Sequence, residues 1–149
     1  MSKKIIAEEI RLRLAQSMPI VERHRAAIAR EMHGRLAQLE DPEEAFGQAE
    51  ITAHMLIELL VDCGSDLAAF GGTRDLGAAA REHRRLDIDG RHYSRFGLAL
   101  APVLREALGV AMPPKIASAW CDAFWFVIAE MAPEETQESR HARASRARG

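Results

Sequence analysis

Apolar residues recur at intervals of three and four along most of this chain, and that spacing constrains its fold more than any other feature. Residues spaced in this way lie along one side of an α-helix, whereas a strand would show alternation at two. The longest such stretch is residues 48–70, with Ile51, Met55 and Leu59 on one edge. β-Branched residues are scarce, and the helix-favouring Ala, Leu, Arg and Glu dominate. The sequence therefore predicts an all-α protein.

Breaks in this spacing divide the chain into segments. Pro19, the Asp41-Pro42 pair and Pro113 mark such breaks, because proline does not continue a helix. The segments that we expect to be helical are about 5–16, 21–39, 48–70, 73–83, 91–108 and 114–131. We expect residues 1–132 to form one domain. Residues 133–149 lose the apolar spacing and turn basic, which predicts a frayed, disordered tail.

Charge and cysteine content argue against several classes of protein. The 20 basic and 22 acidic side chains give a net charge of −2, which argues against nucleic acid as a partner. Cys63 and Cys121 are too far apart for a Cys-x-x-Cys metal site, and free thiols fit a reducing cytoplasm. No uncharged run approaches the roughly 18 residues of a membrane span. We therefore expect a soluble cytoplasmic chain that binds neither nucleic acid nor membrane.

The stretch from His83 to Gly97 carries the most distinctive spacing in the chain. Ile88 follows His83 by five residues, Tyr93 by ten and Gly97 by fourteen. This places a histidine at the end of a short helix and a tyrosine at the start of the next. A neutral imidazole in such a position can bind a metal through one ring nitrogen while the other forms a hydrogen bond that sets its basicity.

With the order of its helices, this spacing resembles the globin domain of bacterial flavohaemoglobins and related single-domain bacterial globins, over about residues 10–135. Ala119 and Trp120 match an Ala-Trp pair near the start of the family's last helix, and Phe46 falls where the family has a Phe against the haem edge. The resemblance implies a globin fold with helices A, B, E, F, G and H and a short corner in place of a long CD region. It also implies haem b as the cofactor.

The same resemblance assigns roles around the iron. It makes His83 the proximal ligand, with Tyr93 and either Glu135 or Glu134 in a hydrogen-bonded set beside it. The remaining cofactor-binding residues that we expect on this side are Arg84, as a partner of the haem propionates, with Ile88, Phe96, Gly97 and Trp120. Alternatively, His83 is an exposed residue in an arginine-rich turn.

On the distal side the sequence departs from the family. Met32 stands where the family has a Tyr, Ile51 stands where it has a Gln, and Met55 follows one turn later. Without these donors a bound dioxygen forgoes about 1.5–3 kcal/mol of charge-assisted hydrogen bonding, so stable oxygen storage is not expected. His54 lies beside Met55 and is a possible sixth iron ligand; the alternative places it at the haem edge or in solvent.

Three functions remain open on this basis. The first is a haem-binding globin that binds or senses small gaseous ligands. It would not be a self-sufficient enzyme, since neither the distal donors nor a Gly-x-Gly-x-x-Gly reductase motif is found. The second is a carrier of biliverdin or another linear tetrapyrrole, with Cys63 and Asp66 in a Cys-x-x-Asp pattern. The third is a haem-free, globin-like sensor or interaction module.

Other polar and aromatic residues are assigned to the surface. His24, His33, His92 and His141 show no metal-binding spacing, and Glu43 and Glu44 fall on a corner expected to be solvated. Trp125 and Phe126 lie on the opposite side of the last helix from Trp120 and Phe124. They are consistent with a homodimer through the last two helices.

Overall fold

The computed structural model describes residues 4–148, with side chains as far as residue 131. The described residues form helices and contain no strand, so the predicted all-α class is confirmed. The helices are α1 (Glu8–Arg23), α2 (Arg25–Gln38), α3 (Gln48–Phe70), α4 (Gly77–Arg85), α5 (Gly90–Leu108) and α6 (Pro114–Arg148), with a short 3₁₀ turn, η1, at Gly109–Ala111.

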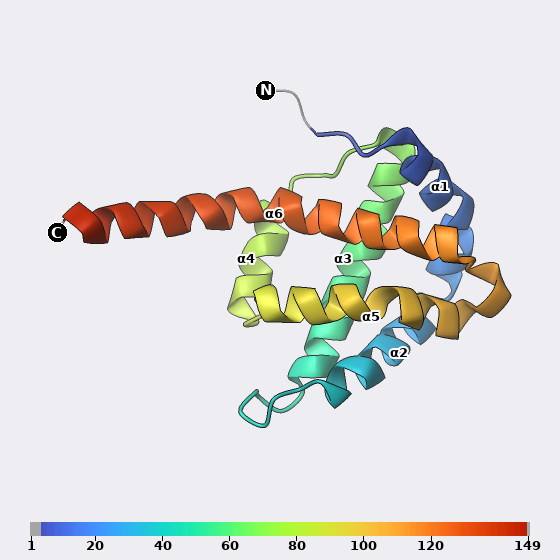
Figure 1. The fold of residues 1–149 in the computed structure, drawn as a ribbon, viewed down its shortest axis with the longest axis horizontal. Coiled ribbons are helices and arrows are strands. Elements are labelled where there is room, and N and C mark those ends of the chain that lie inside the picture. Colours follow the sequence, from blue (N-terminus) through green and yellow to red (C-terminus); the bar gives the residue numbers. More distant parts are fainter. Residues whose placement is uncertain (1–3, 149) are drawn as a thin grey trace.

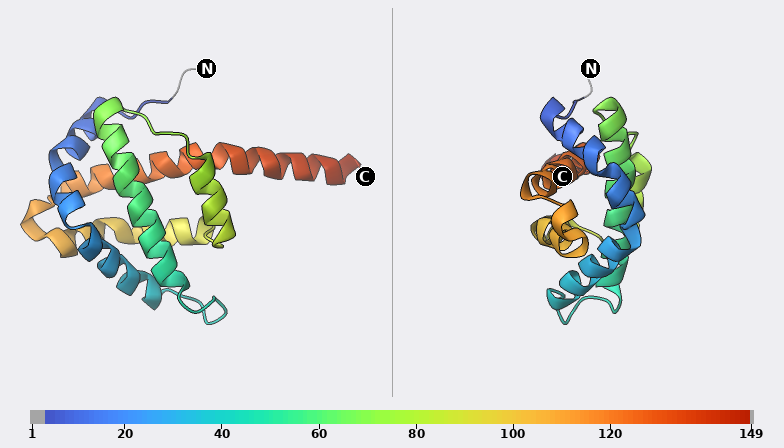
Figure 2. Two further views of the ribbon diagram at one scale, coloured as in Figure 1. Left: turned by 180° about the vertical axis from the view of Figure 1, so that it is seen from behind. Right: turned by 90° about the vertical axis from the view of Figure 1, so that its right-hand side faces the viewer.

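The helices form two layers, as the side view of Figure 2 shows. α5 and α6 run antiparallel in one layer, and α1, α2 and α3 pack across them in the other (Figure 1). α4 packs against α6 and shares no comparable interface with α3, although the two are consecutive in the chain. No described helix combines the length and the apolar character that crossing a membrane would require.

Aromatic side chains fill the centre between the layers. Trp120, Phe96 and Phe124 are almost completely buried. The Phe96 and Phe124 rings lie with their centroids 4.7 Å apart, an aromatic pair of the kind that contributes about 0.5–1.5 kcal/mol beyond area burial. The indole N–H of Trp120 donates to Ser17 Oγ at 2.8 Å, which ties α6 to α1 inside the core.

Side-chain caps fix the ends of the helices that flank His83. Asp75 Oδ1 accepts from the Gly77 N–H at 2.9 Å where α4 begins. Asp89 starts α5: its carboxylate accepts from the Arg91 N–H at 3.0 Å, and its own N–H donates to His92 Nδ1 at 3.1 Å. These reciprocal bonds form a capping box and set the direction in which α5 leaves the turn.

The predicted helices 5–16, 21–39 and 73–83 form instead over Glu8–Arg23, Arg25–Gln38 and Gly77–Arg85, and two of the predicted ends were far from the observed ones. α1 does not end near Pro19 but continues to Arg23. Pro19 lies on the exposed side of α1, where water can satisfy the backbone carbonyl that proline leaves without a partner. α6 does not end near Met131 but continues to Arg148, because Ala, Glu and Arg favour helix even without a packing face. The side chains of Glu134 and Glu135, the predicted acidic partners, lie outside the described residues.

Candidate functional site

His83 and Tyr93 meet across the turn between α4 and α5. His83 Nδ1 lies 3.1 Å from the Tyr93 hydroxyl, within hydrogen-bonding distance. The turn is closed by the Ile88 N–H, which donates to the His83 carbonyl at 2.9 Å. The His83 side chain is 1% exposed and that of Tyr93 is 8% exposed. The two residues with the most distinctive spacing in the sequence therefore form a buried polar pair.

Burial also sets the protonation state of His83. Desolvation lowers the pKa of His83 below its usual value, and the nearby Glu82 carboxylate opposes this only in part. The ring is therefore neutral near pH 7. In the tautomer that carries its hydrogen on Nδ1, that hydrogen is donated to the Tyr93 oxygen, and Nε2 keeps the lone pair that a metal would need.

The other predicted site residues divide into buried and exposed groups. Met32, Ile88, Phe96 and Trp120 are buried, and Met55, Arg84 and Gly97 are partly buried. Phe46, Ile51 and His54 are exposed, and Phe46 is fully so. Gly97 has a packing reason to be glycine, because a Cβ there would lie 2.4 Å from the Trp125 ring. The structure thus brings His83, Tyr93 and Ile88 together but turns Phe46, Ile51 and His54 outward.

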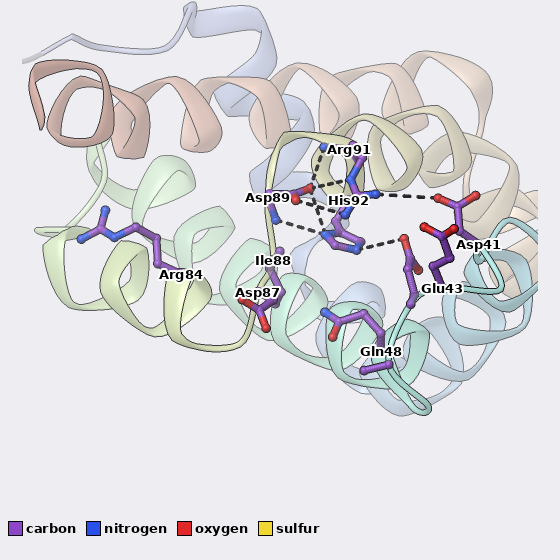
Figure 3. A pocket seen from close by; sticks show the side chains of 11 residues that line it. Asp41, Glu43, Gln48, Arg84, Asp87, Ile88, Asp89, Arg91 and His92 are labelled. Carbon is purple, nitrogen blue, oxygen red and sulfur yellow. Dashed lines mark hydrogen bonds and ion pairs between the residues drawn. The ribbon is translucent and has the colours of Figure 1, made fainter. Parts of the chain in front are cut away.

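A polar pocket of about 510 Å³ opens beside the turn that follows His83 (Figure 3). It lies between the corner that joins α2 to α3 and the start of α5. His83 itself is not among its lining residues, although its neighbours Arg84 and Ile88 are. The full lining is Asp41, Glu43, Glu44, Ala45, Gln48, Arg84, Asp87, Ile88, Asp89, Arg91 and His92.

Polar and charged side chains beside this pocket join the corner to α5. Arg95 donates to Glu44 Oε1 at 2.7 Å and to Asp41 Oδ2 at 3.1 Å. His92 Nε2 lies 3.5 Å from the same oxygen of Glu44, and Arg91 lies 3.7 Å from Asp41. The hydrogen bond to Glu44, more than that to Asp41, raises the pKa of Arg95. The corner is therefore fastened to α5 by charged groups.

The surface assignments of His92 and Glu44 were wrong. His92 is only 5% exposed and the Glu44 side chain only 8%. The capping bond from the Asp89 N–H turns the His92 ring inward, and Arg95 holds the Glu44 carboxylate against α5. The Asp-x-x-His pattern at 89–92 could have indicated the His92 position, since it is a variant of the capping box. No comparable pattern points to the pairing of Glu44 with Arg95.

Gln48 is a further residue that the sequence did not indicate. Its Nε2 donates to the Leu86 carbonyl at 3.2 Å and to Thr52 Oγ1 at 3.3 Å. The bond to Leu86 joins the first turn of α3 to the turn that follows α4. A glutamine at a helix start is common in sequences, and only the fold shows that this one reaches across to another element.

Cys63 does not have the properties of a reactive thiol. Its side chain is completely buried, and desolvation raises the pKa of the thiol to about 12. Because the thiolate is the nucleophilic form, Cys63 is not poised to form a covalent bond to a bilin. A linear tetrapyrrole would have to bind without that attachment.

Among the residues whose side chains are described, no group of three or more His, Cys, Asp or Glu is arranged to hold a metal ion. A haem iron, however, takes its in-plane ligands from the porphyrin, so one histidine is a sufficient protein ligand.

A scan against protein-family models finds no match to this chain, and a search of curated proteins finds no relative.

Proposed function

We propose that this chain is a haem-binding, single-domain globin in which His83 is the proximal iron ligand. The observation that carries the proposal is the buried, neutral His83 whose Nδ1 is bonded to Tyr93. A hydrogen bond at the ring nitrogen that does not bind the metal orients a ligating imidazole and raises its basicity. The order of the helices supports the globin fold: two helices, a corner, a long helix, a short helix that carries His83, and two long helices.

The residues around His83 suit the ligand chemistry of haem, but the structure is closed around them. α3 and α4 share at most a minor interface, so haem would lie between these two helices. Ile88 and Phe96 would offer apolar contacts, and Arg84 a charge for a propionate. Because His83 is only 1% exposed, side chains between α3 and α4 must move before a porphyrin can reach Nε2.

When bound, haem would supply an iron with a position for a small gaseous ligand. The chain offers Met32, Ile51 and Met55 as the distal residues, none of which donates a hydrogen bond to that ligand. Dioxygen would then lack about 1.5–3 kcal/mol of charge-assisted stabilisation. Binding or sensing of a gas, or handling of haem itself, is therefore a better role than oxygen storage.

A haem-free sensor or interaction module with the same fold is the second candidate. The specific observation in its favour is the closed packing around His83, together with the outward position of Phe46. In that case the His83–Tyr93 bond only stabilises the junction of α4 and α5. Haem affinity separates the two candidates, because only the first predicts a specific site.

Absorbance spectra of the purified protein during titration with haem test the proposal. We expect a shifted Soret band at one haem per chain, lost in His83→Ala and kept in His54→Ala, whose parent side chain is exposed. A Soret band that is unchanged in His83→Ala would show that the assigned ligand is wrong. Absence of a specific band in all three proteins favours the haem-free module. A parallel titration with biliverdin would reveal a bilin carrier by a change in red absorbance.

A further inference from the structure

The polypeptide chain connects α3 and α4 directly at only one end of the two helices. α3 ends at Phe70 and α4 begins at Gly77, so the short segment between them joins the two helices at that end (Figure 1). At the other end the first turn of α3 faces the last turn of α4, and no chain connection joins them. The Gln48 bond to the Leu86 carbonyl spans the gap there.

The polar pocket lies at this unconnected end. Its lining comes from the α2–α3 corner, the start of α3, the α4–α5 turn and the start of α5. Arg84 and Ile88 line it, and in the sequence they stand two residues before and after Leu86, which accepts the Gln48 bond. The pocket therefore borders the turn that follows the helix carrying His83.

We propose that the Gln48–Leu86 hydrogen bond and the Glu44–Arg95 ion pair form a clasp that has to open before haem can reach His83. The inference rests on the proposed haem function and concerns the regulation of access to that site. Glu44 holds the α2–α3 corner against α5, and Gln48 holds the start of α3 against the α4–α5 turn. The Gln48 bond must break for α3 and α4 to separate at this end, and the Glu44 pair must break for the corner before α3 to leave α5.

Polar contacts hold the corner to α5: besides the Glu44–Arg95 pair, Asp41 lies 3.1 Å from Arg95 and 3.7 Å from Arg91. Pro42, Glu43, Ala45 and Phe46 are all exposed, so the corner contributes almost no apolar packing. Glu44 is its most buried charged group, and its partner Arg95 has a side chain 22% exposed. A pair so shielded from water is screened less than a surface pair. Arg95, which bonds both Glu44 and Asp41, is therefore the main link between the corner and α5.

A matched ion pair elsewhere in the protein provides a control. Arg25 on α2 lies 2.5 Å from Glu58 on α3, with side chains 31% and 53% exposed. This pair joins two helices, and neither of its residues lines the pocket. Arg95→Met and Arg25→Met thus each remove one guanidinium from a long-range ion pair, and only Arg95 belongs to the clasp. Gln48→Ala tests the second bond independently.

The test combines two measurements on the full chain. Without haem, hydrogen exchange of residues 41–49 and 86–92 should quicken in Arg95→Met and Gln48→Ala but not in Arg25→Met. With haem, stopped-flow measurement of the Soret band should show uptake about tenfold faster in the two clasp variants than in the wild type or Arg25→Met. Circular dichroism confirms that each variant is folded; if Arg95→Met does not fold, Gln48→Ala decides.

Equal uptake rates in all proteins, with a normal Soret band, would overturn the clasp and leave the haem function standing. Unchanged exchange in both clasp variants would also overturn it. A wild type that takes up no haem at a specific site would overturn the proposed function, and the clasp as a gate with it.

Discussion

The buried imidazole of His83 gives the protein a built-in sensitivity to mild acid. Because burial lowers the pKa of His83, the unfolded chain binds a proton at this residue more readily than the folded chain does. The free energy of unfolding therefore falls as the pH drops below about 6.5, the usual histidine value, and the full contribution is present above it. The folded protein resists protonation at the residue that we propose as the iron ligand.

We expect the melting temperature of the wild type to fall more than that of His83→Gln between about pH 7.5 and about pH 5.5. Thermal unfolding followed by circular dichroism measures both. The hydrogen bond from Arg85 lowers the pKa of the neighbouring Glu82, so that carboxylate stays charged throughout this window and does not contribute to the difference. Identical pH dependence in the two proteins would mean that His83 is not the group responsible.

Tyr93→Phe tests the partner of His83 by removing one hydroxyl from the buried pair. The substitution keeps the ring and leaves the His83 Nδ1 without the side-chain bond measured at 3.1 Å. Loss of a buried hydrogen bond should lower the free energy of unfolding by about 1–3 kcal/mol. Urea denaturation gives this value directly. A loss below about 0.5 kcal/mol would show that water replaces the hydroxyl.

Within single helices, two glycines show the difference between a position limited by helix propensity and one limited by side-chain packing. Gly34 on α2 is exposed, and a Cβ there would meet nothing within 4 Å. Gly64 on α3 is buried, and a Cβ there would lie 2.7 Å from the Trp120 ring. Alanine at position 34 can therefore add helix propensity without a clash. Alanine at position 64 would collide with Trp120, at a place where α3 packs against α6.

We expect Gly34→Ala to raise the free energy of unfolding by about 0.5–1 kcal/mol and Gly64→Ala to lower it by about 1–3 kcal/mol. Chemical denaturation of the two variants beside the wild type provides the comparison. If both alanines stabilise the protein, α3 and Trp120 can move apart without cost, and the packing argument fails.

The helices differ in how well their sequences predicted them. α3 was predicted over residues 48–70 and forms over Gln48–Phe70, because glycine flanks it on both sides and its apolar edge is continuous. Gly47 and Gly71 have positive φ values of 84° and 76°, which glycine adopts easily. The end of α1 depends on which side of the helix Pro19 faces, and the end of α6 depends on helix propensity. The spacing of apolar residues shows neither.

At the scale of the whole molecule, local spacing indicated the His83–Tyr93 pair, but it could not indicate the clasp. His83 and Tyr93 are ten residues apart on consecutive helices, so a single turn brings them together. Glu44 and Arg95 are separated by 51 residues and meet only after α2, α3 and α5 have packed. Long-range pairs of this kind depend on the complete fold, and a single sequence contains no local signal for them.

The outer face of α5 and α6 is the surface that we propose for a homodimer. Leu98 is 81% exposed, and the exposed Trp125 lies against Gly97 beside it. Phe126, by contrast, is partly buried against the core and does not belong to this face. Large apolar side chains that adjoin on a surface favour association, and a twofold axis would bring the same face of a second copy against this one.

Leu98→Glu should shift the protein to a smaller species if that face holds a dimer, since each interface would receive two buried carboxylates. Light scattering after size-exclusion chromatography measures the mass. Val110→Glu, at another exposed apolar residue, should leave the mass unchanged. A wild type that is monomeric at every concentration tested would exclude the dimer.

α4 makes few contacts with the other described helices, and this affects how the protein would respond to a bound cargo. α4 has nine residues, and its one substantial interface among the described helices is with α6. A short helix with a single neighbour unfolds locally at less cost than the whole domain. A cargo bound to His83 would therefore favour the folded form of α4 over its detached form. The degree of order in α4 would then differ between the empty and the cargo-bound protein.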